Sequence, residues 1–186
     1  MSTQPLEQAV SSTRSVLAGV KRDQLASATP CDSWTVSQLI DHIVGGQYFF
    51  AALVNGEGAS REPRTFADRD FLAEFDKGSA ACLAAFGAEG AMDRIVELPF
   101  GDMPGSRFVG LATVDTFVHG WDLAKATGQN PNFDPQLAAT LLEGSRQNIQ
   151  EAFRGPDGQA PFGPEQKAPA EASTADQLAA FLGRSV

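Results

Sequence analysis

The sequence is poor in cysteine, histidine and basic side chains, and each shortage excludes a class of protein. Two cysteines among 186 residues, Cys31 and Cys82, form no CxxC pair and cannot supply the disulfide framework of a small secreted domain. Lysine and arginine number 14 against 23 aspartate and glutamate, which gives a net charge of −9. This balance disfavours nucleic acid and anionic membrane surfaces, so we expect neither as a partner.

Long hydrophobic segments are also missing. No apolar run approaches the ~20 residues that a membrane-spanning helix needs. The first five residues, MSTQP, lack the basic start and apolar core of a signal peptide. We therefore expect a cytoplasmic protein. Cys82 falls within an apolar helical pattern and is interpreted as a core residue, whereas nothing around Cys31 favours a reactive thiol.

The sequence does contain strong signals for amphipathic helices. The clearest helix start lies at Thr35, where Thr35 and Gln38 form a capping box. Trp34 precedes the cap and is expected to pack on Leu39 as a hydrophobic staple. The sequence Asn55-Gly56 ends this helix.

Further helices are expected at about 5–20, 66–86, 102–128, 134–153 and 174–183. Asp102 is expected to cap the fourth long helix, with Pro104 in its first turn, and Thr174 with Gln177 repeats the capping box. Residues 57–64 are interpreted as a loop. Residues 94–99 alternate briefly like a strand but have no evident partner, so we interpret them as an extended connector.

Four long amphipathic helices without apolar strand runs predict an all-α protein. The expected architecture is an antiparallel four-helix bundle with additional short C-terminal helices. A length of 186 residues fits a single domain over 1–186. From about residue 155 the chain is rich in Pro, Gly and Ala and is expected to wrap irregularly over the surface.

The two histidines, His42 and His119, both fall on inward faces of predicted helices. Asp115 precedes His119 by four residues, so the two side chains share one side of a helix, roughly 5–6 Å apart at Cβ. This separation lets a carboxylate oxygen and an imidazole nitrogen bind one ion. His42 would supply the third ligand from a neighbouring helix, as helical bundles do when they build metal sites.

Three protein ligands leave a coordination position open, which is typical of catalytic rather than structural zinc sites. Two imidazoles and one carboxylate suit zinc, ferrous iron, nickel or manganese, and the pattern does not choose among them. A simpler interpretation competes with the metal site: Asp115 and His119 form a hydrogen-bonded pair within one helix, and His42 is a buried core histidine. The cost of an unpaired Asp on an apolar stripe favours the ion.

Two segments resemble a known family. Residues 29–42 read TPCDSWTVSQLIDH, which is similar to the TPC-x-x-W-x-V-x-x-L-x-x-H opening of DinB/YfiT-like bundle proteins. Residues 115–128 read DTFVHGWDLAKATG, which is similar to an acidic-x-x-x-H-x-W-D-L-A-x-A-T-G element of one branch. That branch contains the mycothiol-dependent maleylpyruvate isomerase N-terminal domain. The segments at 162–164 and 181–184 also resemble the ends of its short actinobacterial members.

The resemblance implies a four-helix bundle with a divalent metal held by His42, Asp115 and His119, zinc first among the candidates. It further implies mycothiol, or bacillithiol, as a thiol co-substrate, and a possible homodimer. The chain departs from the isomerase in two respects. It has no room for the isomerase's additional C-terminal domain, and Asp115 stands where the isomerase has Glu.

The expected function is that of a metal-dependent enzyme which binds a small thiol as thiolate and uses it on a small electrophile, as an S-transferase or isomerase. A metal-dependent hydrolase is one alternative. Others are a non-catalytic metal- or small-ligand-binding module and a purely structural bundle.

Six more positions carry weaker expectations. Trp121 is expected to pack between helices. Asp122 is interpreted either as an acceptor that orients an imidazole or as a polar bundle residue. Arg107 and Lys125 either meet an anionic substrate or belong to a solvated helix face, which we favour. The pair Gly45-Gly46 is expected to allow close helix approach.

Overall fold

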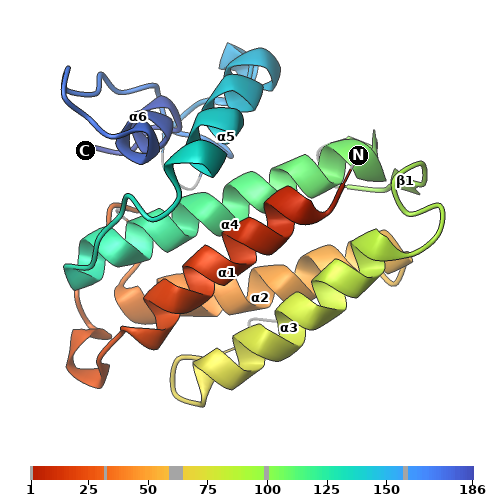
Figure 1. Ribbon diagram of the computed structural model, residues 1–186, viewed down its shortest axis with the longest axis horizontal. Helices are drawn as coiled ribbons and strands as arrows, with labels where there is room; N and C mark the ends of the chain where they lie inside the picture. The colour runs from red at the N-terminus through yellow and green to blue at the C-terminus, as the bar shows by residue number, and fades with distance from the viewer. Residues whose placement is uncertain (1, 32, 59–64, 99–100, 157–158) are drawn as a thin grey trace.

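Four long helices lie side by side in the computed structural model, which describes residues 2–31, 33–58, 65–98, 101–156 and 159–186 (Figure 1). They are α1 (Gln4–Ala18), α2 (Val36–Asn55), α3 (Phe71–Gly87) and α4 (Gly105–Thr127). A short 3₁₀ turn, η1 (Arg22–Gln24), lies between α1 and α2. The all-α expectation is confirmed.

The helix directions differ from a simple antiparallel order. One core cluster joins the ends of α2 and α3 to the starts of α1 and α4, including Val54, Phe86 and Phe108. Another joins the starts of α2 and α3 to the ends of α1 and α4, including Leu39 and Phe75. The helices α2 and α3 therefore run in the same direction. The antiparallel expectation holds for α1 with α2 and for α3 with α4, and was wrong for α2 with α3.

The predicted signals at the two ends of α2 are confirmed. Thr35 Oγ1 accepts a hydrogen bond from the backbone N–H of Gln38, and the Gln38 side chain accepts one from the N–H of Thr35 at 2.9 Å. Gly56 ends the helix in the left-handed conformation, with φ of 75°. The end of α4 follows the same rule at Gly128.

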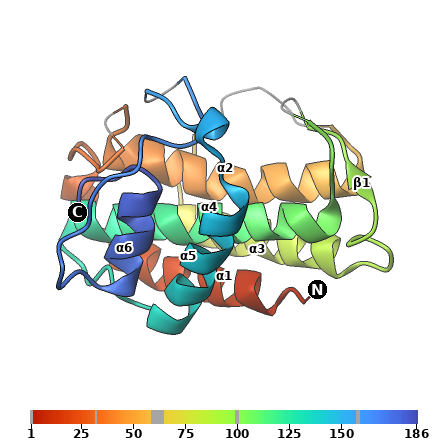
Figure 2. The same cartoon turned by 90° about the horizontal axis from the view of Figure 1, so that it is seen from above.

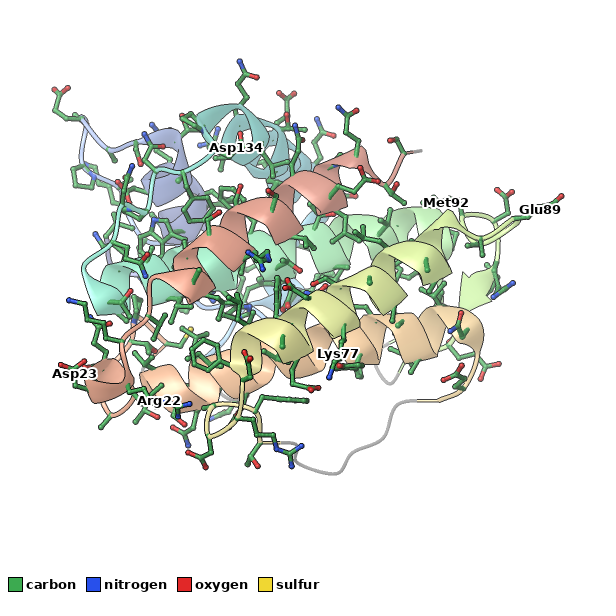
Figure 3. The ribbon with its side chains drawn as sticks, turned by 60° about the horizontal axis from the view of Figure 1, so that its bottom comes forward. Arg22, Asp23, Lys77, Glu89, Met92 and Asp134 are labelled. Carbon is green, nitrogen blue, oxygen red and sulfur yellow. The ribbon has the colours of Figure 1, made fainter. Side chains whose placement is uncertain are left out.

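Several other helix boundaries differ from the sequence-based expectation. The third helix begins at Phe71 rather than Phe66, because the Asp70 side chain accepts a hydrogen bond from Ala73 N and caps it there. The last helix, α6 (Thr174–Phe181), is capped by Ser173 instead of Thr174. The fifth, α5 (Pro135–Asn148), ends before a 3₁₀ turn, η2 (Glu151–Phe153). Asp134 caps α5 (Figure 3).

The connector before α4 is a small hairpin, so the expectation of an unpaired extended segment was wrong. Strand β1 (Ile95–Val96) pairs antiparallel with β2 (Met103–Pro104). Asp102 does not cap α4; its side chain accepts from Leu98 N at 3.4 Å within the hairpin, and Pro104 precedes the helix. Pro99, like residues 59–64 of the expected loop, lies outside the described residues.

The helices α5 and α6 pack against each other on the side of α4 that faces away from α3 (Figures 1 and 2). Between them the chain is irregular, as expected, and Arg154 anchors it. The guanidinium of Arg154 donates to the carbonyl oxygens of Gly163 at 3.0 Å and Phe181 at 2.7 Å. These bonds tie the segment that follows α5 to the end of α6.

Close helix approach occurs at a different glycine from the expected pair. A Cβ on Gly120 would collide with the side chain of Thr13 on α1, whose hydroxyl donates to Thr116 O at 2.9 Å. A Cβ on Gly45 or Gly46 would meet only ordinary contacts at 3.7 Å. A glycine in close contact between helices therefore lies on α4, one residue after His119.

The connection between α1 and α2, with Arg22 and Asp23, lies at one end of the bundle, and that between α3 and α4, with Glu89 and Met92, lies at the other (Figure 3). In the described part of the chain, no helix is both long enough and apolar enough to cross a membrane.

Candidate metal centre

The segment that precedes α2 is folded tightly by the Thr29 hydroxyl. Thr29 Oγ1 accepts from Cys31 N at 3.1 Å and lies 2.9 Å from the carbonyl oxygen of Trp34, to which it can donate. An isolated bridge between Ala28 and Thr35 closes the same turn. These bonds place Cys31 and Trp34 beside the first turns of α2, where His42 lies.

The facing side of the site comes from α4. Asp115, His119 and Asp122 follow one another at intervals of four and three residues, which places them on one face of the helix. This face points into the protein: the side chain of Asp115 is 25% exposed, that of His119 10% and that of Asp122 fully buried. Three polar side chains in such positions require partners.

The three residues predicted as ligands lie together. His42 Nε2 is 3.5 Å from Asp115 Oδ1, and His119 Nδ1 is 3.4 Å from the same oxygen. The ring centroids of the two histidines are 4.4 Å apart. One ligand atom from each of the three side chains lies within 4.8 Å of the others, which is the spacing at which side chains can share one ion.

The charges in this cluster shift its titrations. Burial alone would raise the pKa of Asp115, but the two imidazoles beside it hold the pKa of that carboxyl well below its usual range. Burial opposes protonation of His42, yet the Asp115 carboxylate outweighs it and raises the pKa of this imidazole. The cluster thus favours positive charge next to Asp115.

The hydrogen bonds of the two imidazoles identify where a cation fits. His119 Nδ1 lies 2.9 Å from the Asp115 carbonyl oxygen, which can only accept, so Nδ1 carries the proton and Nε2 has the free lone pair. His42 Nε2 is buried and has no hydrogen-bond partner among the described residues. An unpartnered imidazole nitrogen aimed at a carboxylate is the arrangement that a divalent metal completes, so the donor set fits such an ion.

A second layer of polar groups lies behind His119. The Arg184 guanidinium pairs with Asp122 at two points, with Nε 3.2 Å from Oδ1 and Nη2 3.0 Å from Oδ2. The Cys31 thiol donates to Asp122 Oδ2 at 3.2 Å. Burial and then the charge of Asp122 raise the pKa of the Cys31 thiol, while Asp122 raises the pKa of Arg184 against the opposing effect of burial. Asp122 thus pairs with Arg184 and Cys31, and the ligand atoms of Cys31, His119 and Asp122 lie within 4.8 Å of one another.

Trp34 forms an aromatic wall of the cluster. Its ring centroid lies 4.5 Å from that of His42 and 5.7 Å from that of His119. It also packs against the core cluster that contains Leu39, as a hydrophobic staple would. Trp34 therefore does more than fix the entry of α2, because its ring covers both histidines.

Other residues singled out in the sequence lie away from the cluster. Arg107 and Lys125 are exposed on α4, and Lys125 lies over the Trp121 ring at 5.3 Å. Trp121 is fully buried and donates through Nε1 to Asp176 on α6 at 3.0 Å, which confirms its packing role. Cys82 is a buried core residue, and burial raises its thiol pKa to about 12.

Sequence reasoning missed Arg184 as part of the cluster. No spacing rule connects it to Asp122, which lies 62 positions earlier. The only signal was indirect: a carboxylate on an apolar helix stripe is costly, so Asp122 required a cationic partner from another part of the chain. The cysteine of the TPC segment was likewise not expected at the site.

Comparisons with known proteins agree with this architecture. The sequence model of the mycothiol maleylpyruvate isomerase N-terminal domain family matches residues 6–124. Two uncharacterized proteins of Mycobacterium tuberculosis, from strains CDC 1551 and H37Rv, are each 42% identical over 171 residues. The matches cover 92% of this chain and 91% of each relative.

Two crystal structures of mycothiol-dependent maleylpyruvate isomerase share the fold. The structure of the isomerase has a TM-score of 0.60 at 18% identity, and that of a mutant has a TM-score of 0.57 at 17% identity. Each match covers 82% of this chain and 72% of the isomerase. The resemblance inferred from the two histidine-containing segments is confirmed, and with it the all-α, DinB-like fold.

Proposed function

We propose that this chain, which belongs to the mycothiol maleylpyruvate isomerase N-terminal domain family, binds one divalent metal ion through His42, Asp115 and His119. In this proposal it uses the ion to activate a small thiol, of the mycothiol class, against a small electrophile. The family relationship supports the thiol. The metal is argued from this chain's own side chains.

The observation that carries the proposal is the unpartnered Nε2 atom of His42. A buried imidazole nitrogen without a hydrogen bond costs free energy, and the neighbouring Asp115 carboxylate lies 3.5 Å away, too far for a good hydrogen bond. Both groups gain a strong interaction if a cation lies between them. This is the reason to prefer a metal site over a purely structural bundle.

The surrounding residues prepare the ligands. The Asp115 carbonyl holds the Nδ1 proton of His119 and so directs the Nε2 lone pair into the cluster. The Trp34 ring lies against both imidazoles and limits their motion. When bound, a divalent ion lowers the pKa of a coordinated thiol and so yields a nucleophilic thiolate at neutral pH.

The chemistry that follows depends on the electrophile. In a transfer reaction the thiol loses its proton, the thiolate sulfur forms a bond to an electrophilic carbon, and the leaving group on that carbon departs with the electron pair of the bond that breaks. In an isomerisation the thiolate adds to an activated double bond, the intermediate rotates, and elimination releases the thiolate unchanged. Zinc is the metal we favour, because it combines imidazole, carboxylate and thiolate ligands readily.

The first experiment is elemental analysis of tag-free protein purified without added metal or chelator, followed by titration of the metal-free protein with zinc. We expect about one equivalent in the wild type. The His42→Ala variant should lose the metal and remain folded, because His42 is one-third exposed and leaves no large cavity. The matched control is Asp76→Asn, which removes an exposed carboxylate on α3 that pairs with Arg14.

If the wild type takes up none of zinc, nickel, iron or manganese, the proposed function is wrong. If His42→Ala binds zinc as tightly as the wild type, the ligand assignment is wrong. Thiol binding without turnover of any electrophile would identify a ligand-binding module instead of an enzyme.

A further inference from the structure

Arg184 has one N–H group whose role the ion pair with Asp122 does not explain. Its Nη2 atom donates to Asp122 Oδ2 at 3.0 Å and also lies 3.5 Å from His119 Nε2 and 3.6 Å from Cys31 Sγ. The Nη2 atom has two protons, and Asp122 takes one of them. The second points toward the histidine and the thiol.

The histidine nitrogen that Arg184 faces is the one expected to bind metal. Because His119 Nδ1 holds its proton against the Asp115 carbonyl, Nε2 offers the lone pair of the neutral ring. An ion on Nε2 occupies that lone pair. The facing guanidinium N–H, 3.5 Å from Nε2, then keeps only the weak sulfur acceptor of Cys31 at 3.6 Å and remains directed at the centre.

The charges of the cluster show what kind of acceptor replaces the histidine. Arg184 neutralises Asp122, and the two side chains are 13% and 0% exposed. A divalent ion against Asp115 alone therefore retains one positive charge at a poorly hydrated position. One monoanionic ligand neutralises it, whereas the same site without Arg184 would already be neutral.

We propose that Arg184 makes the loaded centre select a monoanionic ligand, a thiolate or a carboxylate. Its second Nη2–H, whose acceptor here is the weak sulfur of Cys31, would donate to the atom that fills the metal's open position. This inference rests on the proposed metal site. It makes the segment that follows α6 a determinant of ligand charge, a role that belongs to no residue of the two histidine-containing motifs.

Hydrogen bonds other than the proposed one fix the position of the Arg184 guanidinium. Its Nη1 donates to Leu182 O at 3.2 Å, and Arg154 anchors the end of α6 through Phe181 O. The fork of Nε and Nη2 on one carboxylate fixes the plane of the group. Little conformational entropy is then lost when a ligand accepts the remaining proton.

The test uses the full chain loaded with cobalt(II), whose visible spectrum reports a change in ligands. The probes are 2-mercaptoethanol as a thiolate, acetate as a carboxylate and imidazole as a neutral ligand. In Arg184→Gln, we expect affinity for the anionic probes to fall roughly 10- to 100-fold, the factor for a charge-assisted hydrogen bond. Affinity for imidazole should stay within about twofold. The losses of affinity for 2-mercaptoethanol and for acetate show which of the two anions Arg184 favours more.

Two further variants separate charge from geometry and from folding. Arg184→Lys keeps the charge but not the planar fork, so its anion affinity should lie between those of the wild type and Arg184→Gln. Arg107→Gln, which removes an exposed arginine of α4, should match the wild type for all three probes. Cobalt content, measured in parallel, should remain one equivalent in every variant.

Equal losses for imidazole and the anions, or no loss for either, would overturn the role of Arg184 while leaving the metal site intact. Loss of cobalt from Arg184→Gln would also overturn it, because Arg184 would then act on the ligands themselves. Failure of the wild type to bind cobalt is a different result, which contradicts the proposed function.

Discussion

His42 Nε2 on α2 and Asp115 Oδ1 on α4 lie 3.5 Å apart, face to face across the bundle. The distance exceeds that of a good N–H···O hydrogen bond, and His42 Nε2 has no other partner in the described part of the chain. Two helices thus present complementary groups that an ion, but not a direct bond, would join. The metal predictions below depend on this relationship.

The first prediction concerns the carboxylate. Asp115→Asn keeps the shape of the side chain but removes the anionic ligand, so zinc affinity should fall by more than about 100-fold, the upper range for loss of an outer-shell partner. Asp115→Glu restores the carboxylate and should recover part of that loss. Competition with a chromogenic chelator measures both variants. Unchanged affinity in Asp115→Asn would remove Asp115 from the ligand set.

The second prediction is the pH dependence of the metal-free protein. Burial lowers the pKa of His42, but the Asp115 carboxylate outweighs burial, so the pKa lies above its ordinary value of 6.5. The pair therefore contributes stability fully below pH 6.5 and loses it as pH rises through the raised value. Urea unfolding should show a larger stability difference between the wild type and Asp115→Asn at pH 6 than at pH 9.

Zinc should reverse this trend, because metal binding requires neutral imidazoles and so strengthens as pH rises. The prediction is contradicted if the zinc-loaded wild type loses stability from pH 6 to pH 8 as steeply as the metal-free protein does. At the acid end the sign is opposite: the lowered pKa of Asp115 gives stability above pH 3.8 that is lost on acidification.

The third prediction tests the contact between α1 and α4. A Cβ on Gly120 would collide with Thr13, so Gly120→Ala should destabilise the protein by about 1–3 kcal/mol, the usual cost of overpacking. Gly110→Ala, on the same helix but with no described atom within 4 Å of its new Cβ, should stabilise by up to about 1 kcal/mol. Denaturant midpoints of the two variants should therefore shift in opposite directions.

The fourth prediction concerns the cap of α2. Thr35 Oγ1 satisfies the backbone N–H of Gln38, and Thr35→Ala should cost about 1 kcal/mol of stability. Thr35→Ser retains the oxygen and should cost much less. Because His42 follows two turns later on α2, zinc affinity of a folded Thr35→Ala should change little. Thermal unfolding and zinc titration together separate the two effects.

The fifth prediction is the low reactivity of Cys31. Burial and then Asp122 raise the pKa of this thiol, so the folded protein should react slowly with iodoacetamide at pH 8. Asp122→Asn removes the negative charge and should speed alkylation by about tenfold for each unit by which the pKa falls. Peptide mapping assigns the modified cysteine. Rapid modification of Cys31 in the wild type would contradict the buried arrangement.

The helix content and most of the α2 and α4 boundaries follow from local chemistry. Capping at Thr35 and termination at Gly56 and Gly128 depend only on residues within one turn. Local signals failed where two residues competed for one role, as Ser173 replaced Thr174 at the cap of α6. They also failed for the strand before α4, because its partner follows seven to nine residues later and shows no alternation of its own.

Composition and spacing along the chain limit which residues are available for the candidate centre. With two histidines in the chain and one carboxylate four residues before the second, few ligand sets can be built, and periodicity places all three side chains on inward faces. The family motifs gave the same three positions. The spacing of Asp115 and His119 along one helix is fixed by backbone hydrogen bonding, whereas the approach of His42 from α2 depends on how the helices pack.

Only the tertiary structure decided what surrounds that centre. The parallel run of α2 and α3, the Trp34 ring over both histidines and the Arg184–Asp122 pair all join segments that are distant in sequence. Such contacts depend on how the helices pack and on where the segment that follows α6 lies. No local periodicity encodes either. A carboxylate at a buried position predicts that a partner exists, but the fold decides which side chain that partner is.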